Sequence, residues 1–306
     1  MSLRHKKMWA ALALSLLLCC AQGSLAQKQK EQNKSDKSPL HVRLNVTVLD
    51  ADNRPVSDAA REDFQLFENE TPQTITEFST HAGSLRYGLV IDCSGSLRTQ
   101  IDSVIKASKA IVSNTKPEDE AFLLRFVSSD KITLEQDWTS SRAQLERALD
   151  NLYPEGGASA IVDAVYKAAE HIVERRKVER MQRRDALILI TDGQERASSH
   201  TLSQLLQLLR DTNLQVFAIG LTQENRKQAE SFLNTLANET GGRAFFLNSA
   251  SELPQVTSEI TMELGAQYLV GYDSTNGKRD GSFRKVRVRL GDKRTALARP
   301  GYTAPK

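Results

Sequence analysis

Three short polar clusters in this sequence carry residues that could bind a metal ion. They are DCSGS at residues 92–96, GGAS at 156–159 and TDG at 191–193. Their converging oxygen donors are the carboxylates of Asp92 and Asp192 and the hydroxyls of Ser94, Ser96 and Ser159. A set of oxygen ligands without a histidine or a thiolate suits a hard divalent cation, so we expect Mg²⁺, or else Mn²⁺ or Ca²⁺.

The spacing inside the first cluster favours this interpretation. Asp92, Ser94 and Ser96 alternate along the chain, so their oxygens can point in one direction as a strand turns into a loop. Gly95 lets the backbone bend there. Taken alone, such a segment is more often a turn than a metal site. The metal interpretation therefore depends on the other two clusters reaching the same place.

Apolar strands alternate with amphipathic helices over residues 84–267, and this pattern predicts how the clusters meet. Strands are expected at 87–92, 121–127, 186–192, 214–220 and 243–248, and helices at 97–114, 159–176, 201–210, 228–239 and 252–265. Strands that are apolar on both faces indicate an α/β domain with a doubly wound, mostly parallel sheet and helices on both faces. The carboxyl ends of parallel strands form one edge, where ligands bind. Segment 132–138 follows its neighbour too closely for a crossover, which predicts an antiparallel edge strand.

The segments on either side of this domain have the pattern of half-buried strands. Residues 41–49 and 283–290 alternate apolar and polar side chains, and further strands are expected at 64–67, 74–76 and 268–273. A half-buried strand has an apolar face that it cannot cover alone. We therefore expect the flanks 39–83 and 268–306 to pack together as one small β module, with the α/β domain inserted into it.

The first 26 residues have the pattern of an export signal. Basic residues precede an apolar run at 9–20, and Ser24-Leu25-Ala26 offers small residues where a signal peptidase reads. The run is too short to span a bilayer of ~30 Å, and no later segment is long enough, so no transmembrane segment is expected. We expect a mature chain that begins at Gln27 with a polar linker over 27–38, exported to the periplasm or outside the cell. Lipid attachment at Cys19 is less favoured, because leucines precede that residue.

Charge and cysteine content argue against other classes of protein. The chain has 41 basic and 38 acidic residues, and the first 26 residues hold three of the basic ones and none of the acidic ones. The remainder is neutral, which argues against nucleic acid as a partner. Cys93 alone remains beyond the signal, and its apolar setting predicts a buried side chain rather than a nucleophile. The basic run at 175–184 is interpreted as a solvated helix end.

Taken together, the Asp-x-Ser-x-Ser cluster, the hydroxyl after Gly-Gly and the Thr-Asp-Gly cluster resemble the metal-ion-dependent adhesion site of von Willebrand factor type A (VWA) domains. The resemblance covers residues 84–267. The flanking segments DFQLFEN and RDGSFRKVRVRL are similar to those of the exported bacterial proteins called VWFA-related. Ser159 stands where the family usually has threonine, so it keeps the hydroxyl and lacks the methyl group that restricts χ1.

This resemblance implies a role for each residue of the site. Ser94 and Ser96 are then direct ligands, Ser159 is a ligand in the partner-bound state, and Asp92 and Asp192 bind directly or through water. The last position belongs to water or to an Asp or Glu of a protein partner. The family thus implies an adhesion-type protein-binding module that is not an enzyme.

Two other functions stay open on the sequence. A structural VWA scaffold with a vestigial metal site would keep the fold without binding the cation. A secreted serine hydrolase would need a base near Ser94 or Ser96, and His200 is the one histidine near a site loop. Metal titration separates the scaffold from the binding module. Loss of a hydrolytic activity in a Ser94→Ala variant would be needed to support the hydrolase.

Overall fold

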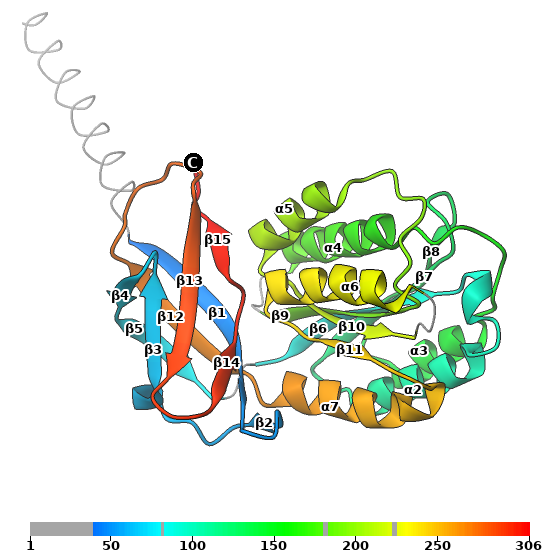
Figure 1. Cartoon of the computed structure of the whole chain (residues 1–306), viewed down its shortest axis with the longest axis horizontal. Helices are drawn as coiled ribbons and strands as arrows, with labels where there is room; N and C mark the ends of the chain where they lie inside the picture. The colour runs from blue at the N-terminus through cyan, green and yellow to red at the C-terminus, as the bar shows by residue number, and fades with distance from the viewer. Residues whose placement is uncertain (1–38, 81–82, 180–182, 222–224) are drawn as a thin grey trace, which may run out of the picture.

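The computed structural model describes residues 39–80, 83–179, 183–221 and 225–306, which form an α/β part and a β part side by side (Figure 1). The predicted export signal at 1–26 and the linker at 27–38 lie outside the described residues. Within the described ranges, none of the helices combines the length and the apolar character needed to span a bilayer.

A six-stranded sheet forms the centre of the α/β part. Its strands lie in the order β11 (Ala244–Phe246), β10 (Gln215–Gly220), β9 (Arg184–Thr191), β6 (Leu85–Asp92), β7 (Glu120–Phe126) and β8 (Ile132–Thr139). All neighbours pair in parallel except β7 and β8, which are antiparallel. The prediction of an antiparallel edge strand at 132–138 is therefore confirmed.

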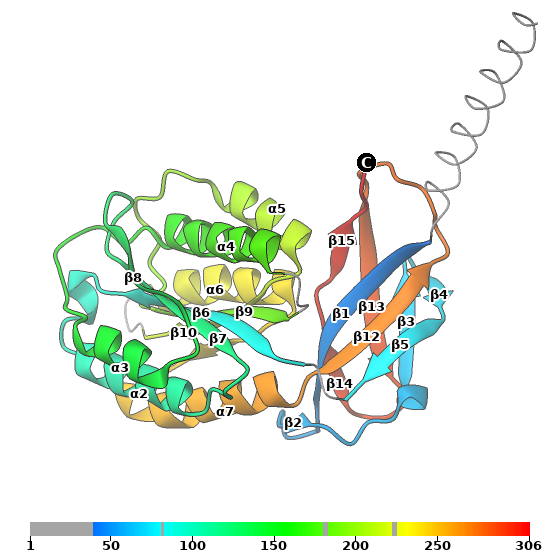
Figure 2. The ribbon, with the colours of Figure 1, turned by 180° about the vertical axis from the view of Figure 1, so that it is seen from behind.

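Helices cover both faces of this sheet (Figure 2). Helices α2 (Ile101–Ser113), α3 (Arg142–Asp150) and α7 (Leu253–Gly265) pack on one face, and α4 (Ile161–Val178), α5 (Leu202–Thr212) and α6 (Arg226–Thr240) pack on the other. Each face of the sheet packs with its helices into a separate apolar core. Successive residues of β6 point into different cores: Leu89 belongs to the core with α2, α3 and α7, and Val90 to the core with α4, α5 and α6, and both are fully buried. The strands are apolar without alternation because both of their faces are covered.

The short helix α3 is an element that the sequence patterns did not predict. It buries Leu145, Ala148 and Leu149. These residues are spaced by three and four positions, as on one face of a helix. This spacing is the sequence pattern that could have predicted α3. The remaining positions are mostly polar and exposed, so the helix has only a narrow apolar stripe.

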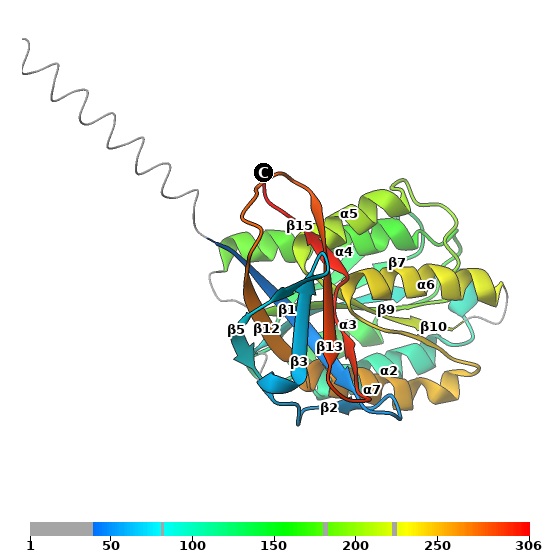
Figure 3. The ribbon, with the colours of Figure 1, turned by 60° about the vertical axis from the view of Figure 1, so that its left-hand side comes forward.

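The β part is built from both flanks of the chain. One sheet has the order β14 (Thr295–Leu297), β1 (Leu40–Leu49), β12 (Tyr268–Ser274) and β5 (Ile75–Ser79), with β2 (Pro55–Val56) also paired to β1; the other has the order β15 (Gly301–Thr303), β13 (Phe283–Leu290), β3 (Phe64–Glu68) and β4 (Thr71–Gln73). Strands β1 and β12 run antiparallel, with Val42 opposite Tyr272. Figure 3 shows β3 and β13 in front of β1 and β12. Apolar side chains of the two sheets form one shared core.

A buried ionic cluster that was not predicted lies inside the β part. Arg284 and Glu68 are almost fully buried, and Arg284 Nη1 lies 3.5 Å from Glu68 Oε1. The hydroxyls of Tyr272 and Tyr302 donate to Glu68 Oε2 at 2.8 and 2.9 Å. Burial raises the pKa of Tyr272, so this hydroxyl stays protonated and remains a donor. The alternation of β13 places Arg284 on the same face as Val286.

Three described arginines of the basic run at 175–184 are ion-paired rather than simply solvated, which corrects the interpretation from sequence for these residues. Arg175 Nη2 lies 2.8 Å from Glu120 Oε1, and Arg183 Nε lies 2.9 Å from Glu179 Oε1. Arg176 donates to Asp185 Oδ2 at 2.6 Å, and Asp185 is almost fully buried. These carboxylates come from strand starts and from the helix end, which the linear pattern of charges did not reveal.

The two crossings between the parts fix the orientation of the central sheet. The chain leaves the β part after β5 to enter β6, and α7 leads back into β12. The amino ends of the parallel strands therefore face the β part, and their carboxyl ends face away from it (Figure 1). At the return crossing Gln267 is fully buried, and its side-chain amide donates to Gln215 Oε1 at 2.9 Å. This bond joins the crossing to the start of β10.

Candidate metal centre

The carboxyl edge of the central sheet brings the first and third clusters into contact. Asp92 is the last residue of β6, and Thr191 is the last residue of the neighbouring parallel strand β9. The Thr191 hydroxyl donates to Asp92 Oδ2 at 2.7 Å, and Gly193 N donates to Thr191 Oγ1 at 3.1 Å. The two strand ends are thus joined directly by a side-chain hydrogen bond.

The second cluster is tied to the first by the loop that precedes α4. Glu155 N donates to Cys93 O at 2.8 Å, and Ser94 forms an isolated β-bridge with Glu155. A β-carbon at Gly157 would lie 2.5 Å from Cγ1 of Val127, so this position requires glycine. The Gly-Gly pair therefore lets the loop pass close to the end of β7.

The Asp92 carboxylate is fully buried and already accepts two hydrogen bonds. Ser94 N donates to Oδ1 at 2.9 Å, and the Thr191 hydroxyl donates to Oδ2. Burial raises the pKa of Asp92 to about 6 despite these bonds, and the nearby Asp192 carboxylate raises it further. The group is still mostly ionised at neutral pH. It therefore presents a buried negative charge that a cation would compensate.

Two buried oxygens at this edge have no hydrogen-bond partner among the described residues: Ser159 Oγ and Asp192 Oδ2. Ser159 is 0% exposed and Asp192 is 4% exposed. The other oxygen of Asp192 accepts from Gln194 N at 2.9 Å. A buried polar atom without a partner costs about 1–3 kcal/mol, and folded proteins keep few of them. Ligation of a cation by both atoms would remove that cost.

The two serines of the first cluster also suit a small cation. Their hydroxyl oxygens lie 2.9 Å apart, with Ser94 buried and Ser96 exposed. Neighbouring ligands of an octahedral ion with bonds of ~2.1 Å are about 3.0 Å apart. In the described part of the chain, no group of three or more His, Cys, Asp or Glu side chains could hold a metal. A cation at this edge would therefore depend on serine hydroxyls as well as on the two carboxylates.

The backbone around Ser159 is held by the loop that follows Asp192. Arg196 N and Ala197 N donate to Ser159 O at 2.9 and 3.3 Å. The Glu195 carboxylate accepts from Val162 N at 2.8 Å, which satisfies a donor in the first turn of α4. Loop 193–200 therefore connects the two residues that carry the unpartnered oxygens.

Asp163 anchors this loop, and no sequence pattern singled it out. Its carboxylate accepts from the Ser129 hydroxyl, from Ser199 N at 2.7 Å and from His200 N at 2.8 Å, and it lies 2.7 Å from His200 Nδ1. Burial alone would raise the pKa of Asp163, but these hydrogen bonds outweigh it and lower the pKa to about 2. An acidic residue in the first turn of a helix is common, so sequence alone gave no reason to assign it this role.

Ion pairs of Glu155 with Arg125 and Lys131, called here the clamp on Glu155, hold the loop that precedes α4. Arg125 is 4% exposed and donates to Glu155 Oε2 at 3.0 Å, and Lys131 pairs with the other oxygen of Glu155. These two cations lower the pKa of Glu155, with Lys131 the larger cause. The Arg125 guanidinium also lies 4.2 Å from the ring centroid of Tyr153. Glu155 is therefore fixed immediately before the Gly-Gly pair.

The groups that nucleophilic catalysis would require are engaged elsewhere. The ring of His200 faces Asp163 and stacks on Tyr166 with 4.0 Å between centroids. Cys93 is fully buried, as predicted, and burial raises the pKa of its thiol to about 12. The thiolate needed for nucleophilic attack is therefore absent at neutral pH.

An α/β sheet with these clusters at its carboxyl edge defines a class of metal-dependent interaction domain. The sequence model of the von Willebrand factor type A domain matches residues 88–259, which is more than half of the chain. The protein belongs to this family. VWA domains commonly act as protein-interaction modules and bind a divalent metal at the adhesion site.

Comparison with known proteins shows the fold at low sequence identity. No curated protein matches the chain. A structure of proximal thread matrix protein 1 from the mussel byssus is 19% identical with a TM-score of 0.50, over 65% of this chain and 51% of that one. A second structure of that protein, with a zinc-occupied MIDAS motif, is 20% identical with a TM-score of 0.49, over 65% and 50%. A VWA protein from Catenulispora acidiphila is 15% identical with a TM-score of 0.49, over 87% and 73%. The chain thus spans about half the length of the mussel protein.

Proposed function

We propose that this protein is an exported, divalent-cation-dependent protein-binding module that is not an enzyme. The cation is Mg²⁺, with Mn²⁺ and Ca²⁺ as alternatives, and its ligands come from Asp92, Ser94, Ser96, Ser159 and Asp192. A partner protein supplies an Asp or Glu carboxylate to the remaining position. The same proposal divides the chain into a signal at 1–26, a linker at 27–38 and a VWA domain at 84–267 inserted between β segments 39–83 and 268–306.

The observation that carries this proposal is the pair of buried oxygens without partners, Ser159 Oγ and Asp192 Oδ2. They come from different elements and are linked by one anchored loop, so the fold fixes both atoms rather than leaving them to relax. Asp92 lies at the same edge with its charge buried. A divalent cation would satisfy the free oxygens and compensate the carboxylates together.

The chain's own residues explain why a partner carboxylate would be favoured. Both oxygens of Asp92 accept a hydrogen bond, so this residue holds Ser94 and Thr191 in place and keeps a second lone pair on each oxygen for the cation or its water. The serine hydroxyls would be uncharged ligands of the cation. When bound, the cation would have mostly neutral hydroxyls as direct ligands, so its open coordination position would favour an anionic ligand. The nearby clamp on Glu155 and the anchor at Asp163 keep the hydroxyls in position.

Calorimetric titration of the mature chain with Mg²⁺ and Mn²⁺ tests the metal site. Asp192→Asn and Ser159→Ala should each abolish or strongly weaken binding. Ser108→Ala is a matched control, because Ser108 Oγ is also buried without a partner but lies in the middle of α2. If neither cation bound the wild-type chain, the vestigial scaffold would replace the proposal.

Capture experiments test the partner and the compartment. Mature protein immobilised in Mg²⁺ should retain a protein that EDTA releases, and the Asp192→Asn variant should not retain it. Substitution of the partner's Asp and Glu residues in the bound segment should then identify a single carboxylate required for binding. N-terminal sequencing of the exported protein should give Gln27, and a mass that retains residues 1–26 or a lipid on Cys19 would contradict the export proposal.

A further inference from the structure

A cavity of about 150 Å³ lies at the opposite edge of the sheet from the metal site. It opens beside Leu85 and Arg184, the first residues of β6 and β9, and is closed by the end of α2 and the end of α7. Its apolar side is formed by Leu85, Ile111, Ile188 and Leu264. An apolar cavity of about 150 Å³ can hold a molecule as large as benzene.

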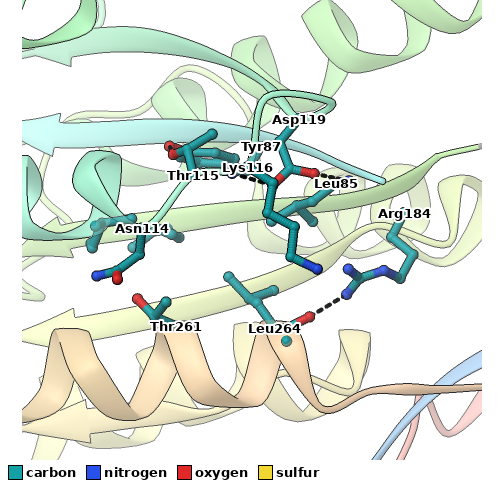
Figure 4. A pocket seen from close by; sticks show the side chains of 12 residues that line it. Leu85, Tyr87, Asn114, Thr115, Lys116, Asp119, Arg184, Thr261 and Leu264 are labelled. Atoms are coloured by element: carbon teal, nitrogen blue, oxygen red, sulfur yellow. Dashed lines mark hydrogen bonds between the residues drawn. The ribbon is translucent and has the colours of Figure 1, made fainter. Parts of the chain in front are cut away.

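Two cations from different elements face this cavity. Figure 4 shows Lys116, which follows α2, and Arg184, at the start of β9, with their charged ends directed toward each other. The Asp119 carboxylate is nearby, but its two oxygens accept from Leu85 N at 2.6 Å and from Lys116 N at 3.0 Å. The cavity therefore carries a net positive charge that its own carboxylate only partly offsets.

Arg184 is bonded differently from the arginines around it. At the same edge, Arg86 and Arg176 both donate to the buried Asp185 carboxylate. Arg184 instead donates from Nη1 to Leu264 O and Gln267 Oε1 and from Nη2 to Gly83 O. A guanidinium has five N–H donors, so two remain unused, and Arg184 Nε is buried without a partner.

The Lys116 ammonium group is also free. Among the described residues, Lys116 Nζ donates no hydrogen bond to an acidic side chain and forms no ion pair, and no carboxylate lies within ion-pair distance of Arg184. Two cations directed at one partly apolar space repel each other unless an anion lies between them. The cavity thus combines two cations that lack an ion-pair partner with an apolar wall.

We propose that this cavity binds a small organic anion, a monocarboxylate with a short aliphatic or aromatic body. Its carboxylate lies between Lys116 and Arg184, and its apolar part lies against Ile188 and Leu264. A single carboxylate matches the net charge of the cavity, and its body matches the apolar wall. Inorganic phosphate has the charge without the body, and a neutral alcohol has the body without the charge.

Benzoate and hexanoate are the probes that test this proposal, with the mature chain in EDTA so that the metal site plays no part. Each should give saturable binding in a calorimetric titration at millimolar concentration and shift the NMR signals of the Leu264 methyl groups. Benzyl alcohol, hexanol and phosphate should bind at least about tenfold more weakly, because a charge-assisted hydrogen bond or the apolar contact is lost.

Lys116→Gln should weaken benzoate binding by about twofold to fivefold, as expected for loss of an ion pair at an exposed lysine. The side chain of Lys116 is exposed, so the substitution should leave the fold intact. Lys106→Gln is the matched control, since Lys106 is an exposed lysine of α2 that does not line the cavity, and it should leave binding unchanged. The proposal is wrong if neither probe binds, if the neutral alcohols or phosphate bind as well as the carboxylates, or if Lys116→Gln has no effect.

Discussion

Replacing Ser159 with alanine should change stability in opposite directions with and without a divalent cation. In the metal-free protein the Ser159 hydroxyl is fully buried and has no partner in the described structure. Such a group costs about 1–3 kcal/mol, and the substitution removes this cost while losing the packing of one small atom. We expect a net gain of about 1 kcal/mol, which for a chain of this size raises Tm by roughly 2–4 °C.

With the cation bound, the sign reverses. A ligand present at about 100 times its Kd stabilises the folded state by about 2.7 kcal/mol. The Ser159→Ala variant should lose most of that stabilisation, because one ligand of the cation is missing. The wild-type chain should therefore melt below the variant in EDTA and above it in saturating Mg²⁺ or Mn²⁺.

Thermal melts of the two proteins in EDTA and in millimolar Mg²⁺ measure this crossover. Ser108→Ala provides the comparison, since it removes a buried hydroxyl without a partner at a place where no cation is expected. Its effect on Tm should be the same in both buffers. If Ser159→Ala also shifted Tm equally in both buffers, the hydroxyl would have only a packing role and the reasoning from its missing partner would fail.

Three further predictions concern groups around the site. Asp163→Asn should weaken cation binding about tenfold or more, because it loosens loop 193–200, and an unchanged calorimetric Kd would show that this loop does not position Ser159. The metal-free protein should lose stability as pH rises from about 4 to about 6, since the folded-state pKa of Asp92 is about 6 against 3.8 for the free group, and urea melts of Asp92→Asn should lack this part of the slope. Gly157→Ala should lower both Tm and cation affinity, because its β-carbon would lie 2.5 Å from Val127, whereas Gly156→Ala, with nothing within 4 Å, should change neither.

The regular part of the fold could be predicted because buried strands and helix faces have a recognisable pattern of apolar residues. Strand 121–127 is apolar on both faces, and the short connection to 132–138 left room only for an antiparallel return. Helix α3 and the short strands β2, β4, β14 and β15 were not predicted. Strands of two or three residues are too short to show a period, and α3 has only a narrow apolar stripe.

The site could be predicted only in part, for a different physical reason. Hard cations restrict their ligands to a few oxygen-bearing residue types, so Asp92, Ser94 and Asp192 could be proposed from type and spacing alone. The residues that hold these ligands in position are not restricted to a few residue types. Asp163 and Glu155 act by accepting hydrogen bonds or pairing with cations from loops far away in sequence, and many other residues could do the same. Their roles depend on loop conformations that no periodic pattern encodes.

A buried polar atom without a partner becomes informative about a ligand only when a second, independent feature lies beside it. Ser108 Oγ lies alone within a helix, and Arg284 Nε belongs to a guanidinium that already contacts Glu68. Neither points to a ligand. At the carboxyl edge, by contrast, Ser159 and Asp192 both carry such an atom and are joined by loop 193–200, and the Asp192 carboxylate acts on the buried Asp92 carboxylate. At the amino edge, Arg184 Nε occurs beside a cavity and a second free cation. The same criterion therefore supports the proposed cation at one edge of the sheet and the proposed anion at the other, in keeping with the opposite signs of the uncompensated charges.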